Sequence, residues 1–75
     1  MNYRLIISYK ITGEVFMQLF KKAEYADDII VHLDRALENG AKLGYELQYR
    51  NEDGENEILD YGGESIGEWT NLQWT

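Results

Sequence analysis

The chain has 75 residues, a net charge of −7 and no cysteine. This length supports one hydrophobic core and excludes a second, so we expect one domain spanning residues 1–75. The lack of cysteine excludes disulfides and thiolate chemistry, and apolar runs such as Leu5-Ile6-Ile7 are far shorter than a membrane span or a signal-peptide core. We therefore expect a cytoplasmic protein that does not enter membranes.

The acidic residues are concentrated toward the C-terminus. Residues 1–22 carry a net charge of +3, residues 23–45 carry −3 and residues 46–75 carry −7. A surface built from the last segment repels nucleic acid phosphates and attracts basic proteins.

The first predicted element pair is a β-hairpin. Two β-rich runs, Tyr3 to Ile11 and Val15 to Lys21, flank a glycine-containing turn. We expect a three-residue loop, Ile11-Thr12-Gly13, with Gly13 in the left-handed region. This register pairs Tyr9 with Val15, Ile7 with Met17 and Leu5 with Leu19. It sends a mixed set of side chains to the opposite face: Arg4, Ile6, Ser8, Phe16, Gln18 and Phe20.

The next segment, Ala23 to Asn39, predicts an amphipathic helix that ends before Gly40. Its apolar residues recur at spacings of three, four and seven, which is the stripe of a helix with one buried face. The residues of this stripe are Ala26, Ile29, Ile30, Leu33, Ala36 and Leu37.

A second hairpin is predicted from Tyr45 to Tyr61, with Glu52-Asp53-Gly54 as a three-residue loop. This register pairs Tyr45 with Tyr61, Leu47 with Leu59 and Tyr49 with Glu57. After Gly62-Gly63, the tail from Ile66 to Trp74 is predicted either as a fifth strand or as a short turn.

These elements predict an α+β fold, a small antiparallel sheet of two hairpins in the order β-β-α-β-β with one helix packed on one face. One helix covers only one face of a sheet. The apolar cluster of Ile6, Phe16 and Phe20 would then lie uncovered on the other face, which indicates a self-association surface for a homodimer.

No motif for catalysis, a metal or a cofactor emerges. Asp28 and His32 have the helical spacing of a shared ligand pair, but two ligands make no metal site, and a solvated surface pair accounts for them. The run from Asn51 to Glu57 resembles a calcium loop only superficially, because its glycine comes too early and Gly62 occupies the closing position. We therefore expect a non-enzymatic protein.

The remaining signal is acidity interleaved with aromatic residues in the C-terminal part. We expect an acidic face that occupies a basic, nucleic-acid-binding surface of a partner enzyme or regulator, by analogy with small phage-encoded DNA-mimic inhibitors, with which the chain shares no motif. The predicted partner-binding residues are Glu52, Asp53, Glu55, Glu57, Glu64 and Glu68, with Trp69 and Trp74 as anchors.

The main alternative function is a self-associating, dimeric structural or regulatory module that uses the second sheet face, and two further alternatives stay open. In the first, the carboxylates serve solubility alone, Tyr45 and Tyr61 belong to the core, and one tryptophan closes the edge of the sheet. Direct nucleic acid binding through Arg4, Lys10, Lys21 and Lys22 is disfavoured by the overall charge, since phosphate neutralisation supplies much of the affinity for nucleic acids.

Overall fold

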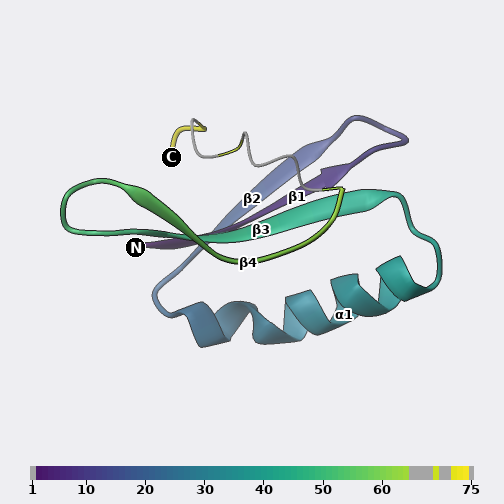
Figure 1. Ribbon diagram of the computed structural model, residues 1–75, viewed down its shortest axis with the longest axis horizontal. Helices are drawn as coiled ribbons and strands as arrows, with labels where there is room; N and C mark the ends of the chain where they lie inside the picture. Colours follow the sequence, from purple (N-terminus) through teal and green to yellow (C-terminus); the bar gives the residue numbers. More distant parts are fainter. Residues whose placement is uncertain (1, 65–68, 70–71, 75) are drawn as a thin grey trace.

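The computed structural model describes residues 2–64, 69 and 72–74. Its elements in chain order are β1 (Tyr3–Tyr9), β2 (Val15–Phe20), the 3-10 turn η1 (Ala23–Ala26), α1 (Asp27–Glu38), β3 (Leu43–Arg50) and β4 (Asn56–Gly63). The strands form one antiparallel sheet in the order β2-β1-β3-β4, and α1 runs along one face of it (Figure 1). The predicted α+β fold is confirmed.

The helix packs on the sheet through the predicted apolar stripe. Ala26, Ile30 and Leu33 are buried, and the remaining members of the stripe are partly buried against the same core. The first turn is 3-10 rather than α-helical, and Gly40 follows the helix with a φ of +89°. From the sheet, the core receives Leu5, Phe20, Leu43, Tyr45 and Leu47.

The predicted register of the first hairpin is wrong by one residue. The loop has four residues, because the Tyr9 N–H donates to the Glu14 carbonyl over 2.9 Å and Lys10 joins the turn. Gly13 does adopt the left-handed region, with a φ of +77°. Ser8 therefore pairs with Val15 and Ile7 with Phe16. A shift of one residue moves every β2 side chain to the other face.

This shift separates the predicted self-association cluster. Phe16 and Phe20 lie on the α1 side of the sheet, where Phe20 belongs to the core and Phe16 makes an edge-to-face contact with Tyr9. Ile6 lies on the opposite side and is wholly buried. The prediction that Ile6, Phe16 and Phe20 form one exposed surface is therefore wrong.

The second hairpin follows its predicted register only near the loop. The three-residue loop and the pairing of Tyr49 with Glu57 are confirmed, with Gly54 at a φ of +79°. A β-bulge then adds Leu59 to β4, so Tyr45 pairs with Gly62 rather than with Tyr61, and Leu47 pairs with Asp60. The buried Tyr45 ring needs this glycine, because a Cβ on Gly62 would lie 2.5 Å from its Cε2 atom.

Candidate functional site

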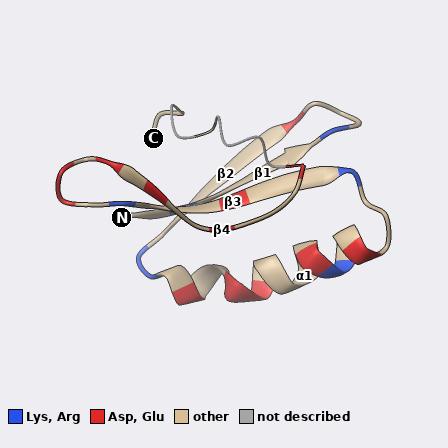
Figure 2. Ribbon diagram, in the orientation of Figure 1, with Lys and Arg blue, Asp and Glu red and all other residues tan. Residues whose placement is uncertain are grey.

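The β3–β4 hairpin carries an exposed acidic surface, which we call the acidic hairpin. Its carboxylates are Glu52, Asp53, Glu55, Glu57, Asp60 and Glu64. All six residues are exposed, and Figure 2 shows the concentration of acidic residues around the loop and the start of β4. Glu68, also predicted as a site residue, lies outside the described residues.

The loop of the acidic hairpin is held by one asparagine side chain. The Asn51 Oδ1 atom accepts hydrogen bonds from the backbone N–H groups of Asp53, at 2.9 Å, and Glu55, at 3.0 Å. The Gly54 N–H donates to the Asn51 carbonyl over 3.0 Å. This turn, in which a side chain replaces backbone acceptors, fixes the loop backbone while its carboxylates point to solvent.

The charge of the acidic hairpin is not neutralised by nearby cations. None of its six carboxylates forms a salt bridge with any described residue. Arg50, the one basic residue of the hairpin, lies with its guanidinium carbon 4.8 Å from the centre of the Trp74 ring. The hairpin therefore presents a net negative potential to solvent.

Exposed apolar side chains lie among these carboxylates on β4. Tyr61 is 69% exposed, Leu59 48% and Ile58 43%. The predicted register placed Tyr61 and Leu59 against the core, so the sequence reasoning missed this feature. The local sequence signal for the bulge is the pair of consecutive apolar residues Ile58 and Leu59, which interrupts the alternation of a strand. Both side chains are exposed at the bulge.

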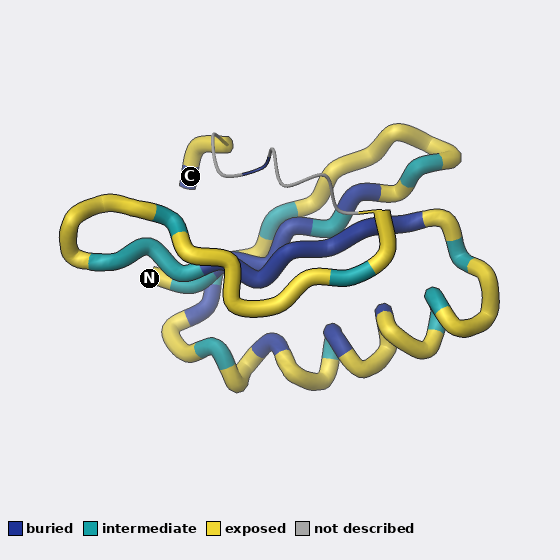
Figure 3. The backbone as a smooth tube through the Cα atoms, viewed as in Figure 1, coloured by how far each residue is buried: buried dark blue, intermediate teal, exposed yellow. Residues whose placement is uncertain are grey.

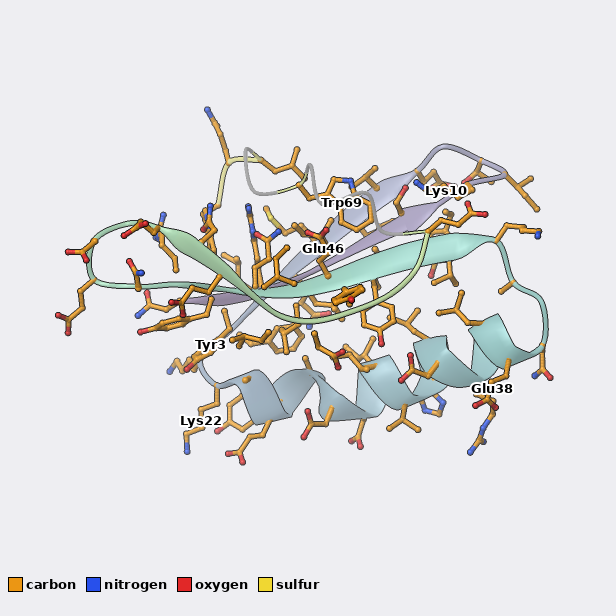
Figure 4. The ribbon with its side chains drawn as sticks, in the orientation of Figure 1. Tyr3, Lys10, Lys22, Glu38, Glu46 and Trp69 are labelled. Atoms are coloured by element: carbon orange, nitrogen blue, oxygen red, sulfur yellow. The ribbon has the colours of Figure 1, made fainter. Side chains whose placement is uncertain are left out.

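The two predicted anchors, Trp69 and Trp74, are turned toward the protein's own sheet. Both are buried on the face away from α1, and Figure 4 shows Trp69 there beside Glu46 and Lys10. The Lys10 ammonium lies 5.7 Å from the centre of the Trp69 ring, and the Trp74 indole N–H donates to Asn56 Oδ1 over 3.0 Å. Neither indole presents its surface to a partner in this arrangement.

Arg4 lies at the centre of this second face and is wholly buried. Its guanidinium donates to the main-chain carbonyls of Trp69 at 2.9 Å, Leu72 at 2.7 Å and Gln73 at 3.3 Å. Its carbon lies 4.4 Å from the centre of the Trp74 ring. Arg4 therefore connects the sheet to the C-terminal segment, a role that the sequence reasoning missed because the partners are more than 60 residues apart.

A buried polar chain continues from Arg4 across the sheet. The Arg4 Nε donates to Gln48 Oε1 over 2.9 Å, and Gln48 Nε2 donates to Glu46 Oε2 over 2.7 Å. Burial lowers the pKa of the Arg4 guanidinium and Arg50 lowers it further, whereas Glu46 raises it. Arginine nevertheless stays charged at any pH that proteins experience. The Arg4 guanidinium is therefore a permanent cation held beneath the C-terminal segment.

An apolar groove of about 790 Å³ opens on the α1 side, between the helix and the first hairpin. Its walls include Ile7, Tyr9, Phe16, Leu33, Ala36 and Leu43. Within the described ranges, no group of three or more potential metal ligands comes together, and no helix is long and apolar enough to cross a membrane.

The sequence and the fold were compared with known proteins. No protein-family model, curated protein or solved structure matches the chain.

Proposed function

We propose that this is a non-enzymatic, cytoplasmic binding protein whose acidic hairpin occupies a basic, nucleic-acid-binding surface of another protein and so inhibits or modulates it. The observation that carries the proposal is the set of six exposed carboxylates on one hairpin, none of them paired with a described cation. A basic partner surface would supply the missing counter-charge.

The hairpin combines two properties of a protein-binding surface. Its loop backbone is fixed by the Asn51 side chain, so little conformational entropy is lost when a partner orders it. Its exposed apolar groups, Ile58, Leu59 and Tyr61, add contact area next to the charges. Charge then selects a basic partner, and apolar contact adds affinity that salt does not screen.

Direct binding of nucleic acid is the weaker alternative. Arg4, one of the four cations on which it depended, is buried and donates to the protein's own carbonyls. The aromatic pair Phe16 and Phe20 lies on the opposite face of the sheet from Arg4. The expected combination of cations and stacking rings on one face is therefore absent among the described residues.

Capture from a lysate of the source organism, after nuclease treatment, tests the proposal. The bait is compared with a hairpin variant, Glu55→Gln/Glu57→Gln/Glu64→Gln, and with a charge-matched helix variant, Glu24→Gln/Asp28→Asn/Glu38→Gln. We expect a partner whose binding weakens at least about tenfold in the hairpin variant and is nearly unchanged in the helix variant. Since both variants lose the same charge, such a difference would come from where the charges lie.

The captured partner is then purified and tested for competition with double-stranded DNA and with RNA. Raising the salt from 0.15 M to 1 M reduces the Debye length from about 8 Å to about 3 Å, so the complex should weaken strongly across this range. Salt-independent binding, equal losses in the two variants, or a partner that binds nucleic acid and this protein simultaneously would contradict the proposal.

A further inference from the structure

The two edges of the sheet differ in how they are protected against pairing with another strand. The β4 edge carries Glu57 and Asp60 together with a β-bulge, which are devices that discourage strand addition. The β2 edge, Val15–Phe20, has no charge, no proline and no bulge. Most of β2 is exposed or half-buried (Figure 3). An apolar edge of this kind is a template for another strand.

The hydrogen bonds of the first hairpin indicate which backbone groups of β2 point away from β1. The Tyr9 N–H donates to the Glu14 carbonyl, so the backbones of these two residues face each other across the ladder, and such positions alternate along an antiparallel pair. The backbone groups of Phe16 and Gln18 therefore point toward β1. Those that point away from the sheet belong to Val15, Met17 and Leu19.

We propose that β2 pairs antiparallel with β2 of a second copy of this chain, so that two sheets join into one sheet of eight strands. Two identical antiparallel strands are related by a twofold axis perpendicular to the sheet, which places residues of the same face opposite one another. The axis therefore lies midway between one residue of β2 and the same residue of the second copy, and the choice of that central residue defines the register.

The register centred on Gln18 matches the side chains best. It places Phe16 opposite Phe20 of the second copy and Glu14 opposite Lys22 of the second copy, and each contact occurs twice. A register centred on Met17 would place Glu14 opposite Phe20, and one centred on Leu19 would place Phe16 opposite Lys22. Aromatic pairs and opposite charges stabilise antiparallel strands, which favours the first register.

The ends of β2 are suited to the charge contact. Lys22 lies two residues beyond the end of β2, where the chain bends toward η1, and its own backbone is extended, with a φ of −137° and a ψ of 144°. Its side chain is 63% exposed, and its contact with Glu24 measures 3.9 Å, the weak geometry of a surface pair. The Lys22 ammonium is thus accessible to a carboxylate across the interface.

Like-charge repulsion between two copies is weaker at this edge than at the other. The segment that contains β2, residues 1–22, has a net charge of +3, whereas residues 46–75, which contain β4, carry −7. Pairing through β2 leaves β4 and the acidic hairpin at the two far ends of the joined sheet. Repulsion between these hairpins is then largely screened at physiological salt, where the Debye length is about 8 Å.

Disulfide trapping tests the register directly, since the chain has no cysteine of its own. Gln18 is exposed, and a pair of Gln18 residues at the axis would have Cα atoms about 4.5 Å apart, within the range that a disulfide spans. We expect Gln18→Cys to form a covalent dimer under mild oxidation at least about tenfold faster than Val15→Cys, which is displaced from the axis on the same strand. Equal rates would overturn the register.

Sedimentation equilibrium tests the surface without cross-linking. We expect Phe16→Lys to raise the dimer dissociation constant at least about tenfold and Ile58→Lys, the same charge change on the β4 edge, to leave it unchanged. Glu14→Lys should weaken the dimer although it lowers the net negative charge, and Glu14→Lys/Lys22→Glu should restore it.

Several outcomes would overturn the proposal: a wild-type chain that stays monomeric at about 500 μM, a dimer unaffected by Phe16→Lys, or equal effects of Phe16→Lys and Ile58→Lys. A monomer that instead binds an extended apolar peptide along β2 would assign the edge to a different occupant. Because β2 and the acidic hairpin are opposite edges of the sheet, either proposal can fail while the other holds.

Discussion

The two faces of the sheet are covered in different ways. The face toward α1 is apolar and packs on the helical stripe around Leu33. The other face has a buried cation, Arg4, and a polar chain through Gln48 to Glu46, and it lies beneath Trp69 and Trp74. One core is therefore built from apolar contact and the other from a cation and two indoles.

This difference follows from the backbone of each covering segment. A helix satisfies its own N–H and C=O groups, so the sheet beneath α1 needs to supply only apolar side chains. The carbonyls of Trp69, Leu72 and Gln73 accept hydrogen bonds from Arg4 instead. Carbonyls that are partly shielded from water need donors, and an arginine offers five N–H groups from one side chain. Where these carbonyls lie over the sheet, the sheet thus supplies a polar donor.

The largest loss of stability is expected when the buried guanidinium of Arg4 is removed. Arg4→Met removes the Arg4 donor from the carbonyls of Leu72 and Gln73 and from Gln48 Oε1, and it leaves the Trp69 carbonyl with the Leu72 N–H alone. It should lower the free energy of unfolding by about 3 to 5 kcal/mol. Arg50→Met is the matched control, because it removes a second cation stacked on Trp74 and no donor to these carbonyls. Urea unfolding followed by far-UV circular dichroism measures both, and equal losses would contradict the role assigned to Arg4.

A somewhat smaller effect is expected on the apolar face. Leu33→Ala should lower the free energy of unfolding by about 3 kcal/mol through lost burial and a residual cavity. Val31→Ala, on the exposed side of the same helix, should change it by less than about 0.5 kcal/mol. If Leu33→Ala costs no more than Val31→Ala, α1 does not stabilise the sheet in the way described.

The smallest effect is expected at the hydroxyl of Tyr45 on the apolar face. The Tyr45 hydroxyl donates to Asp34 Oδ1 over 2.6 Å. Tyr45→Phe removes this hydrogen bond and should cost about 1 kcal/mol near neutral pH. Chemical denaturation of the two proteins at pH 7 measures this difference.

The same variant should become relatively more stable in alkali. The pKa of Tyr45 is raised well above its ordinary value of 10.0, mainly because the side chain is buried. The hydrogen bond to Asp34 and the negative charges of Asp60 and Asp34 raise it further. Because the unfolded chain ionises first, this contribution to stability is complete below about pH 10 and falls by up to about 1.4 kcal/mol per pH unit above it. Tyr45→Phe should lack this part of the alkaline loss, and parallel pH profiles for the two proteins would contradict it.

The sequence predicted the elements that depend on local pattern and missed those that depend on counting across a loop or on distant contacts. The stripe from Ala26 to Leu37 identified the helix because period and burial coincide. Gly13 is compatible with loops of three and four residues, so the β2 register could not be decided from it. The bulge at Leu59 depends on room for the distant Tyr45 ring.

The residues of the candidate site also differ in whether their position could be predicted from local sequence. The exposure of the loop carboxylates, including Glu52 and Asp53, followed from their type and their place in a turn. The burial of Trp69 and Trp74 could not be inferred locally, because it depends on Arg4 at the other end of the chain. A tryptophan among carboxylates has the same sequence signature whether it contacts a partner or its own sheet.

The position of the two tryptophans has a spectroscopic consequence. Both tryptophans of the chain, Trp69 and Trp74, lie on the face away from α1, and the core beneath the helix contains none. Intrinsic tryptophan emission therefore reports on how that segment seats against Arg4, whereas the far-ultraviolet signal reports mainly on the sheet and helix. Thermal melts recorded in the two channels will coincide only if both layers unfold as one cooperative unit. Any separation between them measures how independently the indole layer detaches.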